Sequence, residues 1–297
     1  MTQWVYPNGS AAKGDWEVSL GASDSQPVPG WQYTGIRVAN PRKDQVLTLP
    51  AADEERLVVP LCQRFDVRTP DGLYHLRGRQ NVFTAPTDVV YVGTGTPLEI
   101  YAPSGGRVAV ASAPASTHYP DQLVKAEDNE TVLRGNGPTS RQARNFGMMN
   151  NIEAERLLVC EVITPSGSWS SYPVHKHDRN NDHETALEEI YYFQMRALPG
   201  APDQARPLAY QGASTADERP LNIMTEVHPG DTVLIPYGWH GPSIAAPGYD
   251  LYYLNVMGGG GQRDWKVTIR DDQTWINQAL QSQPRNDRLQ HWAEAGS

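Results

Sequence analysis

The sequence is poor in the features that mark several large classes of protein. It has two cysteines among 297 residues, Cys62 and Cys160, and both lie in apolar, strand-like runs. Such a pair favours buried free thiols over a disulfide framework, which indicates a reducing compartment. Because the N-terminus lacks a basic region followed by an apolar one, it does not resemble a secretory signal, and we expect a cytoplasmic protein.

Long apolar runs and an excess of positive charge are also missing. No run approaches the roughly 18 to 20 apolar residues that a spanning helix needs, so we expect no membrane partner. The formal net charge of −9 argues against general binding to nucleic acid. A small anionic substrate remains compatible with this charge, because a single arginine in a pocket acts locally.

Sustained helical periodicity is scarce, whereas turn-forming residues are frequent, with 26 glycines and 24 prolines. Short strand-like runs separated by turns predict an all-β fold of sandwiches or barrels. Apolar residues at helical spacing predict a short C-terminal helix within 271–289. Strands are expected at 16–20, 36–38, 46–49, 57–67, 81–84, 89–92, 98–101, 108–111, 156–163, 189–195, 221–227, 232–236 and 251–257.

Residues 114–150 are more polar than their surroundings, and we interpret them as a connector between two β units. They contain Arg134, Arg141 and Arg144. Either these arginines are a solvated basic segment, or one of them points into a site and pairs with a substrate carboxylate. We therefore expect an N-terminal barrel over residues 1–140, lacking metal ligands, and a C-terminal barrel over residues 141–297, with the metal site and the terminal helix.

The residues that suggest chemistry lie in 168–193 and 230–240. His175 and His177 are two apart, so on a strand both imidazoles leave the same face, about 6 to 7 Å apart. Glu188 and Glu189 precede an apolar and aromatic run that predicts a strand, and His240 follows a turn, a buried strand and a second turn. Three imidazoles and one carboxylate suit a divalent ion such as Zn, Mn or Fe.

These motifs resemble those of a known superfamily. The elements similar to the cupin motifs are His175-Lys-His177, a glutamate leading into Ile-Tyr-Tyr-Phe, and Gly230-Asp231-x4-Pro236-x-Gly238-x-His240. Together with Thr164-Pro-x-Gly-x-Trp-Ser-Ser-Tyr-Pro, they resemble more narrowly the 5-deoxyglucuronate isomerase family. The resemblance implies a bicupin, two double-stranded β-helix (jelly-roll) barrels with one metal. It also implies an aldose–ketose isomerase that converts 5-deoxy-D-glucuronate to 5-dehydro-2-deoxy-D-gluconate in myo-inositol catabolism, through an enediol.

The resemblance also implies the metal ligands, which would be His175, His177, Glu189 and His240. Side chains alternate along a strand, so Glu188 and Glu189 point to opposite faces. The general cupin pattern places the ligand immediately before an aliphatic residue, here Ile190, which favours Glu189 over Glu188.

Two further roles need residues. A group must move the proton between C2 and C1, and the candidates by proximity are Lys176, Glu188 and Tyr191, with Asp178 and Tyr192 as alternatives. Each of these residue types also suits an ordinary structural role. Binding the substrate calls for a cation and for a wall of the sugar site, and the candidates are Arg179, Arg263, Tyr237 and Trp239, with Arg144 as an alternative cation.

Other hypotheses belong to different functional classes. One is an Fe-dependent cupin dioxygenase, which would consume O2, and the other is a non-enzymatic sugar-binding cupin. The latter would usually carry a DNA-binding helical module or long low-complexity regions, and the sequence shows neither. Exposed sheet edges of two packed barrels would permit a homodimer.

Overall fold

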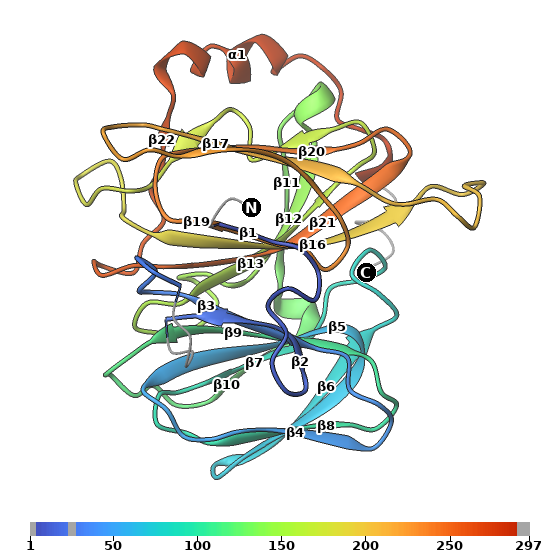
Figure 1. Ribbon diagram of the computed structural model, residues 1–297, viewed down its shortest axis with the longest axis vertical. Coiled ribbons are helices and arrows are strands. Elements are labelled where there is room, and N and C mark those ends of the chain that lie inside the picture. The colour runs from blue at the N-terminus through green and yellow to red at the C-terminus, as the bar shows by residue number, and fades with distance from the viewer. Residues whose placement is uncertain (1–3, 23–27, 290–297) are drawn as a thin grey trace.

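The protein forms two stacked β-barrels (Figure 1), seen in a computed structural model that describes residues 4–22 and 28–289. The predicted all-β fold with two barrels and a short C-terminal helix is confirmed. In the described residues, no helix is long and apolar enough to cross a membrane.

The lower barrel in Figure 1 is a curled sheet of nine strands. The sixteen residues of β5 pair with four other strands, so this long strand links both layers of the barrel. The strands are β2 (Trp16–Gly21), β3 (Gly35–Ala39), β4 (Gln45–Leu49), β5 (Glu54–Thr69), β6 (Gly72–Arg79), β7 (Val89–Val92), β8 (Leu98–Ala102), β9 (Arg107–Pro114) and β10 (Gln122–Val124).

The strand expected over 81–84 is wrong. These residues form a turn, in which the Thr84 amide donates to the Asn81 carbonyl and the Phe83 amide donates to the Asn81 side chain. The Asn81 side chain competes for backbone donors, which favours a turn over a strand.

The upper barrel has two facing sheets. One has seven strands in the order β1-β19-β16-β21-β13-β12-β11, and the other contains β18-β17-β20-β15-β22 with β14 beside β20. The strands are β1 (Val5–Tyr6), β11 (Glu130–Arg134), β12 (Arg141–Gly147), β13 (Leu158–Thr164), β14 (Trp169–Ser170), β15 (His175–Lys176), β16 (Glu188–Ala197), β17 (Ala209–Ser214), β18 (Asn222–Val227), β19 (Thr232–Ile235), β20 (Trp239–Ala245), β21 (Tyr249–Gly258) and β22 (Thr268–Ile269).

The helical elements that lie wholly within residues 28–287 are short. Three 3₁₀ turns span Ala126–Asp128, Gly137–Thr139 and Asp271–Gln273, and the helix α1 spans Ile276–Leu280. The periodic pattern over 271–289 therefore gives a helix of five residues. Trp275, which belongs to that pattern, is 62% exposed, so it is not part of the core.

The polar stretch 114–150 is more than a connector, which corrects the interpretation from sequence. It contains β10, β11 and β12, and the last two extend the seven-stranded sheet. Polar residues on β12 hide the strand pattern, because Arg141 and Asn145 line a cavity while Arg144 pairs with Glu161 on the other face. The chain passes from the lower sheet to the upper one between Val124 and Glu130; the domain division at residue 140 stays a prediction.

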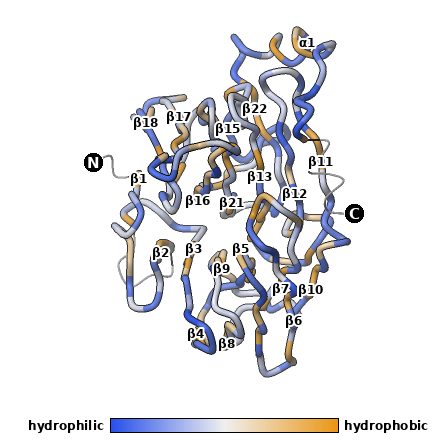
Figure 2. Tube along the Cα trace, turned by 90° about the vertical axis from the view of Figure 1, so that its right-hand side faces the viewer, coloured by the Kyte–Doolittle hydropathy of each residue, from blue (hydrophilic) through white to orange (hydrophobic). Residues whose placement is uncertain are grey.

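The three largest of four buried hydrophobic clusters among the described residues follow from this arrangement. One fills the lower barrel, one fills the upper barrel, and a third lies between the barrels. On β16, Tyr191 and Phe193 belong to the upper barrel's interior, whereas Ile190 and Tyr192 belong to the cluster between the barrels. The strand is therefore buried on both faces, and Figure 2 shows the hydrophobic residues mainly along the strands.

A buried ionic group also joins the two barrels. Arg79 of β6 donates two hydrogen bonds of 2.7 Å to the carboxylate of Glu161 on β13. Arg144 and the hydroxyl of Tyr252 each donate to the same carboxylate at 2.9 Å. A buried carboxylate is tolerated here because charged and neutral donors surround it.

Candidate metal centre

Strand pairing places the predicted ligands inside the upper barrel. The short strand β15 pairs with β20 so that His175 lies opposite His240. In the other sheet, Glu189 is the second residue of β16 and lies opposite Ile235 and Met257. His177 follows β15 directly, so the two sheets bring histidines and a carboxylate toward each other.

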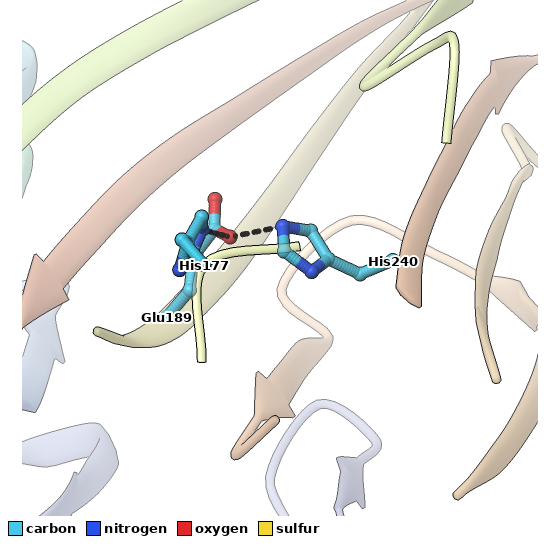
Figure 3. Close-up of side chains that lie close together, drawn as sticks. All are labelled: His177, Glu189 and His240. Carbon is cyan, nitrogen blue, oxygen red and sulfur yellow. Dashed lines mark hydrogen bonds and ion pairs between the residues drawn. The ribbon is translucent and has the colours of Figure 1, made fainter. Parts of the chain in front are cut away.

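His177, Glu189 and His240 form a compact buried cluster (Figure 3). The Nε2 atom of His177 lies 2.9 Å from Glu189 Oε2, and that of His240 lies 3.0 Å from the same oxygen. The three ligand atoms lie within 4.8 Å of one another, and among residues 4–22 and 28–289 this is the one such cluster of three.

The hydrogen bonds of the imidazoles indicate which nitrogens face the cluster. His177 Nδ1 lies 3.2 Å from the Leu187 carbonyl, and His240 Nδ1 lies 3.1 Å from the Gly238 carbonyl. A carbonyl only accepts, so each Nδ1 carries the hydrogen and each Nε2 of a neutral ring presents a lone pair. The buried His240 Nε2 has no hydrogen-bond partner. Two lone pairs facing one carboxylate oxygen are the arrangement that a divalent cation fits.

Electrostatics keep Glu189 and His175 in the forms that bind metals. Burial lowers the pKa of His177, but its hydrogen bond to Glu189 prevails and raises it. Burial raises the pKa of Glu189, but the imidazoles of His240 and His177 prevail and hold it well below its ordinary value. Burial, followed by the neighbouring His240 and His177, lowers the pKa of His175 to about 3. A carboxylate and a neutral imidazole are the ligating forms.

His175 lies beside the cluster of three. Its ring centroid is 4.6 Å from that of His240 and 6.3 Å from that of His177. Its Nδ1 lies 3.1 Å from the Pro173 carbonyl, so its Nε2 is also the atom with a free lone pair. The structure therefore brings all four predicted ligands into one region.

Neighbouring side chains fix the ligand segments in place. Asn255 Nδ2 donates to Glu189 Oε1 at 2.5 Å. Asp178 accepts from Lys176 Nζ at 2.8 Å and from the Gly238 amide at 2.9 Å, which ties the segment of His177 to the turn before His240. Gly238 has φ +86°, and a Cβ there would lie 2.7 Å from the Ser214 carbonyl oxygen, so the turn requires glycine.

The three residues predicted to move a proton lie in different places. Glu188 points away from the cluster, accepts the Gln32 and Tyr33 amides at 2.8 and 2.6 Å, and burial raises its pKa to about 7. Lys176 is held by Asp178 and Glu184. Tyr191 shares the face of Glu189, and burial and the negative charge of Glu189 raise its pKa well above the ordinary value.

The predicted substrate-binding residues all make contacts outside the cavity described below. Arg179 is exposed and lies 3.5 Å from Asp217. Arg263 donates to the carbonyls of Leu157, Ile152 and Gly147. The hydroxyl of Tyr237 donates to the Pro220 carbonyl, and Lys176 Nζ lies 5.6 Å from the ring centroid of Trp239.

A cavity of about 440 Å³ reaches His175 and Glu189. Several of its lining residues were not singled out from the sequence, among them Asn255 and Tyr253, and Arg134 and Arg141 were left with two interpretations. Asn255 did carry a signal, because it is the one amide in the apolar run Leu251–Met257. A polar residue at an inward position of a buried strand needs a partner, and here the partner is Glu189.

Comparison with known proteins decides the family. The model of the KduI/IolB family matches residues 5–276. The chain belongs to the KduI/IolB family. Its curated relatives include the 5-deoxy-glucuronate isomerase of Geobacillus thermodenitrificans, 37% identical over 83% of this chain and 87% of the relative. The 5-deoxy-glucuronate isomerase of Bacillus subtilis strain 168 is 34% identical over 82% of this chain and 88% of the relative.

Solved structures of similar proteins agree with this family assignment and with the fold. An IolB-like protein from Salmonella typhimurium LT2 matches with a TM-score of 0.81 and 29% identity, covering 92% of this chain and 99% of that one. An oxalate decarboxylase from Lactobacillus farciminis matches with a TM-score of 0.62 at 10% identity, covering 96% and 97%. The second likeness concerns the fold alone and supports the cupin architecture of the KduI/IolB family member described here.

Proposed function

We propose that this KduI/IolB family member is a metal-dependent isomerase that converts 5-deoxy-D-glucuronate to 5-dehydro-2-deoxy-D-gluconate in myo-inositol catabolism. The observation that carries the proposal is that the Nε2 atoms of His177 and His240 lie 2.9 and 3.0 Å from one buried carboxylate oxygen of Glu189, beside a cavity. The names of the curated relatives support the substrate.

In this proposal His175, His177, Glu189 and His240 hold a divalent ion, Zn, Mn or Fe. A divalent ion there would supply Lewis-acid stabilisation of the negative charge that grows on the C1 and C2 oxygens during isomerisation. Asn255 orients Glu189 through its hydrogen bond to Oε1. The carbonyls that accept from the Nδ1 atoms keep each Nε2 directed inward.

Among the residues predicted to move the proton, Tyr191 has the most suitable location. Its hydroxyl lies 2.8 Å from Ser171 Oγ, and Ser171 lines the cavity. Because its pKa is raised, Tyr191 stays protonated at neutral pH. It therefore acts as a hydrogen-bond donor through Ser171, stabilising a developing oxyanion, while Lys176 and Glu188 hold neighbouring segments.

The test follows bound metal and turnover together. Four proteins are analysed for metal and incubated with 5-deoxy-D-glucuronate in D2O, and the reaction is followed by NMR. They are wild type, His177→Ala, His240→Ala and the control His75→Ala. The imidazole of His75 is exposed in the lower barrel. We expect wild type and control to bind metal and form the ketose, and the other two to lose both properties. No turnover by metal-loaded wild type overturns the substrate, and turnover retained in both alanine variants overturns the metal site. Oxygen uptake by iron-loaded protein would instead favour a dioxygenase.

A further inference from the structure

Two arginines lie opposite each other at the β11–β12 hairpin. Arg134 ends β11, Arg141 begins β12, and they are direct cross-strand partners. Directly paired residues project to the same face of a sheet, and both arginines line the cavity that contains Glu189 and His175. The cavity thus combines the candidate metal ligands with a pair of cations.

In residues 4–22 and 28–289, no carboxylate forms an ion pair with Arg134 or Arg141. Arg141 donates one hydrogen bond, from Nη1 to the Thr139 carbonyl at 2.9 Å, and the guanidinium of Arg134 lies 4.9 Å from the ring centroid of Trp265. The other face of β12 differs in this respect, because Arg144 there forms an ion pair with Glu161.

Leaving the two cations unpaired is costly. Like charges directly opposite in a sheet repel each other, and a largely buried guanidinium has lost part of its hydration. Consistent with that, burial lowers the pKa of Arg141, and Arg134 lowers it further against an opposing effect of Tyr253. An anion between the two guanidinium groups would offset both effects.

The hairpin is shaped to admit the Arg141 side chain. A Cβ on Gly135 would lie 2.7 Å from Arg141 Nη1 and 2.1 Å from the Thr139 carbonyl oxygen, so glycine leaves the space that the guanidinium uses. Between the arginines and Glu189 the cavity wall offers a polar row, because Asn145, Cys160 and Asn255 pair in register across β12, β13 and β21; the row nearer the arginines consists of Ala143, Val162 and Tyr253. A polyhydroxylated chain would meet hydrogen-bonding groups along the polar row.

We propose that Arg134 and Arg141 bind the carboxylate of the sugar acid, so that its aldehyde end is directed toward Glu189 and the histidines. This inference rests on the proposed function for the position of the aldehyde. Arg141 has unused donors for a bidentate contact, and Arg134 supplies a second positive charge. The pair would make the site selective for acidic sugars over neutral ones, a role that Arg179 and Arg263 do not have from their positions outside the cavity.

Binding that needs no turnover tests the inference directly. D-gluconate and D-glucitol share a six-carbon polyol chain and differ in a carboxylate, and calorimetry measures their affinities for the metal-loaded protein. We expect wild type to prefer gluconate by about 10- to 100-fold, the range of one or two charge-assisted contacts. Arg141→Gln and Arg134→Gln should lose most of this preference, Arg141→Lys should keep part of it, and the exposed control Arg179→Gln should match wild type.

Kinetics separate this inference from the proposed function. In the two glutamine variants KM for 5-deoxy-D-glucuronate should rise about 10- to 100-fold, and thermal unfolding should show that they remain folded. Unchanged KM and unchanged gluconate preference in both variants overturn the inference and leave the isomerase intact. If wild type does not turn over the sugar acid yet prefers gluconate through these arginines, the proposed function fails and the carboxylate site stands.

Discussion

A single amide side chain links the candidate ligand carboxylate to the neighbouring strand. Asn255 Nδ2 donates to Glu189 Oε1, which leaves Oε2 for the two histidines. Partners of this kind fix the orientation of a metal ligand, and their loss usually weakens metal binding. Glu189 therefore depends on a residue of a different strand for its position.

Replacing that amide should weaken the metal site. We expect Asn255→Ala to lower metal affinity about 10- to 100-fold, because Glu189 loses the donor that orients it. Competition with a chelator of known affinity measures the change. Asn129→Ala is the control, since it also removes a buried amide, one that donates to the Thr87 carbonyl away from the site. Equal affinities in wild type and Asn255→Ala would show that the hydrogen bond has no such role.

Residue types predicted the ligand region better than they predicted its surroundings. Strand alternation placed Glu188 and Glu189 on opposite faces, and the resemblance to cupins favoured Glu189. The structure brings Glu189 to the histidines while Glu188 accepts backbone amides on the other face. The arginines show the limit of such reasoning. Arg263 was a candidate cation for the substrate, yet it donates to three backbone carbonyls that are remote in sequence. No local pattern encodes those contacts.

Between the strands, a carboxylate paired with Arg156 holds two loops together. Glu155 accepts the amides of Ser116 and Thr117 at 2.7 and 2.6 Å, so it joins the segment after β9 to the segment before β13. Burial raises the pKa of Glu155, but the amides of Thr117 and Ser116 prevail and lower it to about 2. The folded protein therefore stabilises the charged form of this side chain.

Because folding lowers the pKa of Glu155, its contribution to the free energy of unfolding should depend on pH. The folded pKa of Glu155, about 2, is below its ordinary value of 4.5, so its contribution is complete above about pH 4.5 and is lost as the pH falls toward 2. We expect Glu155→Gln to lower the free energy of unfolding by about 1 kcal/mol at pH 7 and by progressively less in acid. Urea titrations of both proteins from pH 3 to pH 7 measure the difference; a difference that does not change with pH would contradict this expectation.

Elements that contain continuous apolar runs were predictable, and those with polar faces were not. Runs such as 57–67 and 251–257 lie within the observed β5 and β21. By contrast β12 carries arginines and an asparagine because one face lines the cavity and the other meets Glu161. Its strand conformation depends on pairing with β11 and β13, which is a property of the folded chain.

At the scale of the whole molecule, the two barrels share buried structure. A hydrophobic cluster lies between them, and the carboxylate of Glu161 receives donors from both. Removing one partner of a buried ionic group is costly, because the remaining charges stay buried. The expected homodimer stays a prediction, since the contacts described are all within one chain.

We expect Glu161→Gln to lower the free energy of unfolding by about 3 to 5 kcal/mol, since it leaves Arg79 and Arg144 without a counter-charge. Both proteins should unfold in one transition, because the shared cluster couples the barrels. Urea unfolding followed by circular dichroism measures both properties. The control Glu226→Gln changes a side chain that is 46% exposed and should have little effect. A loss below 1 kcal/mol for Glu161→Gln would show that the ionic group contributes little.

The two buried faces of β16 have a consequence for how mutations are tolerated. Glu189 and Tyr191 face the candidate site, while Ile190 and Tyr192 face the other barrel. In a saturation screen scored separately for cellular abundance and for catalytic turnover, harmful substitutions should therefore alternate in kind along this strand. Substitutions at 190 and 192 would lower the abundance of the protein. Many substitutions at 189 would instead leave the protein abundant but inactive. The two kinds of defect would therefore alternate with a period of two residues along the strand.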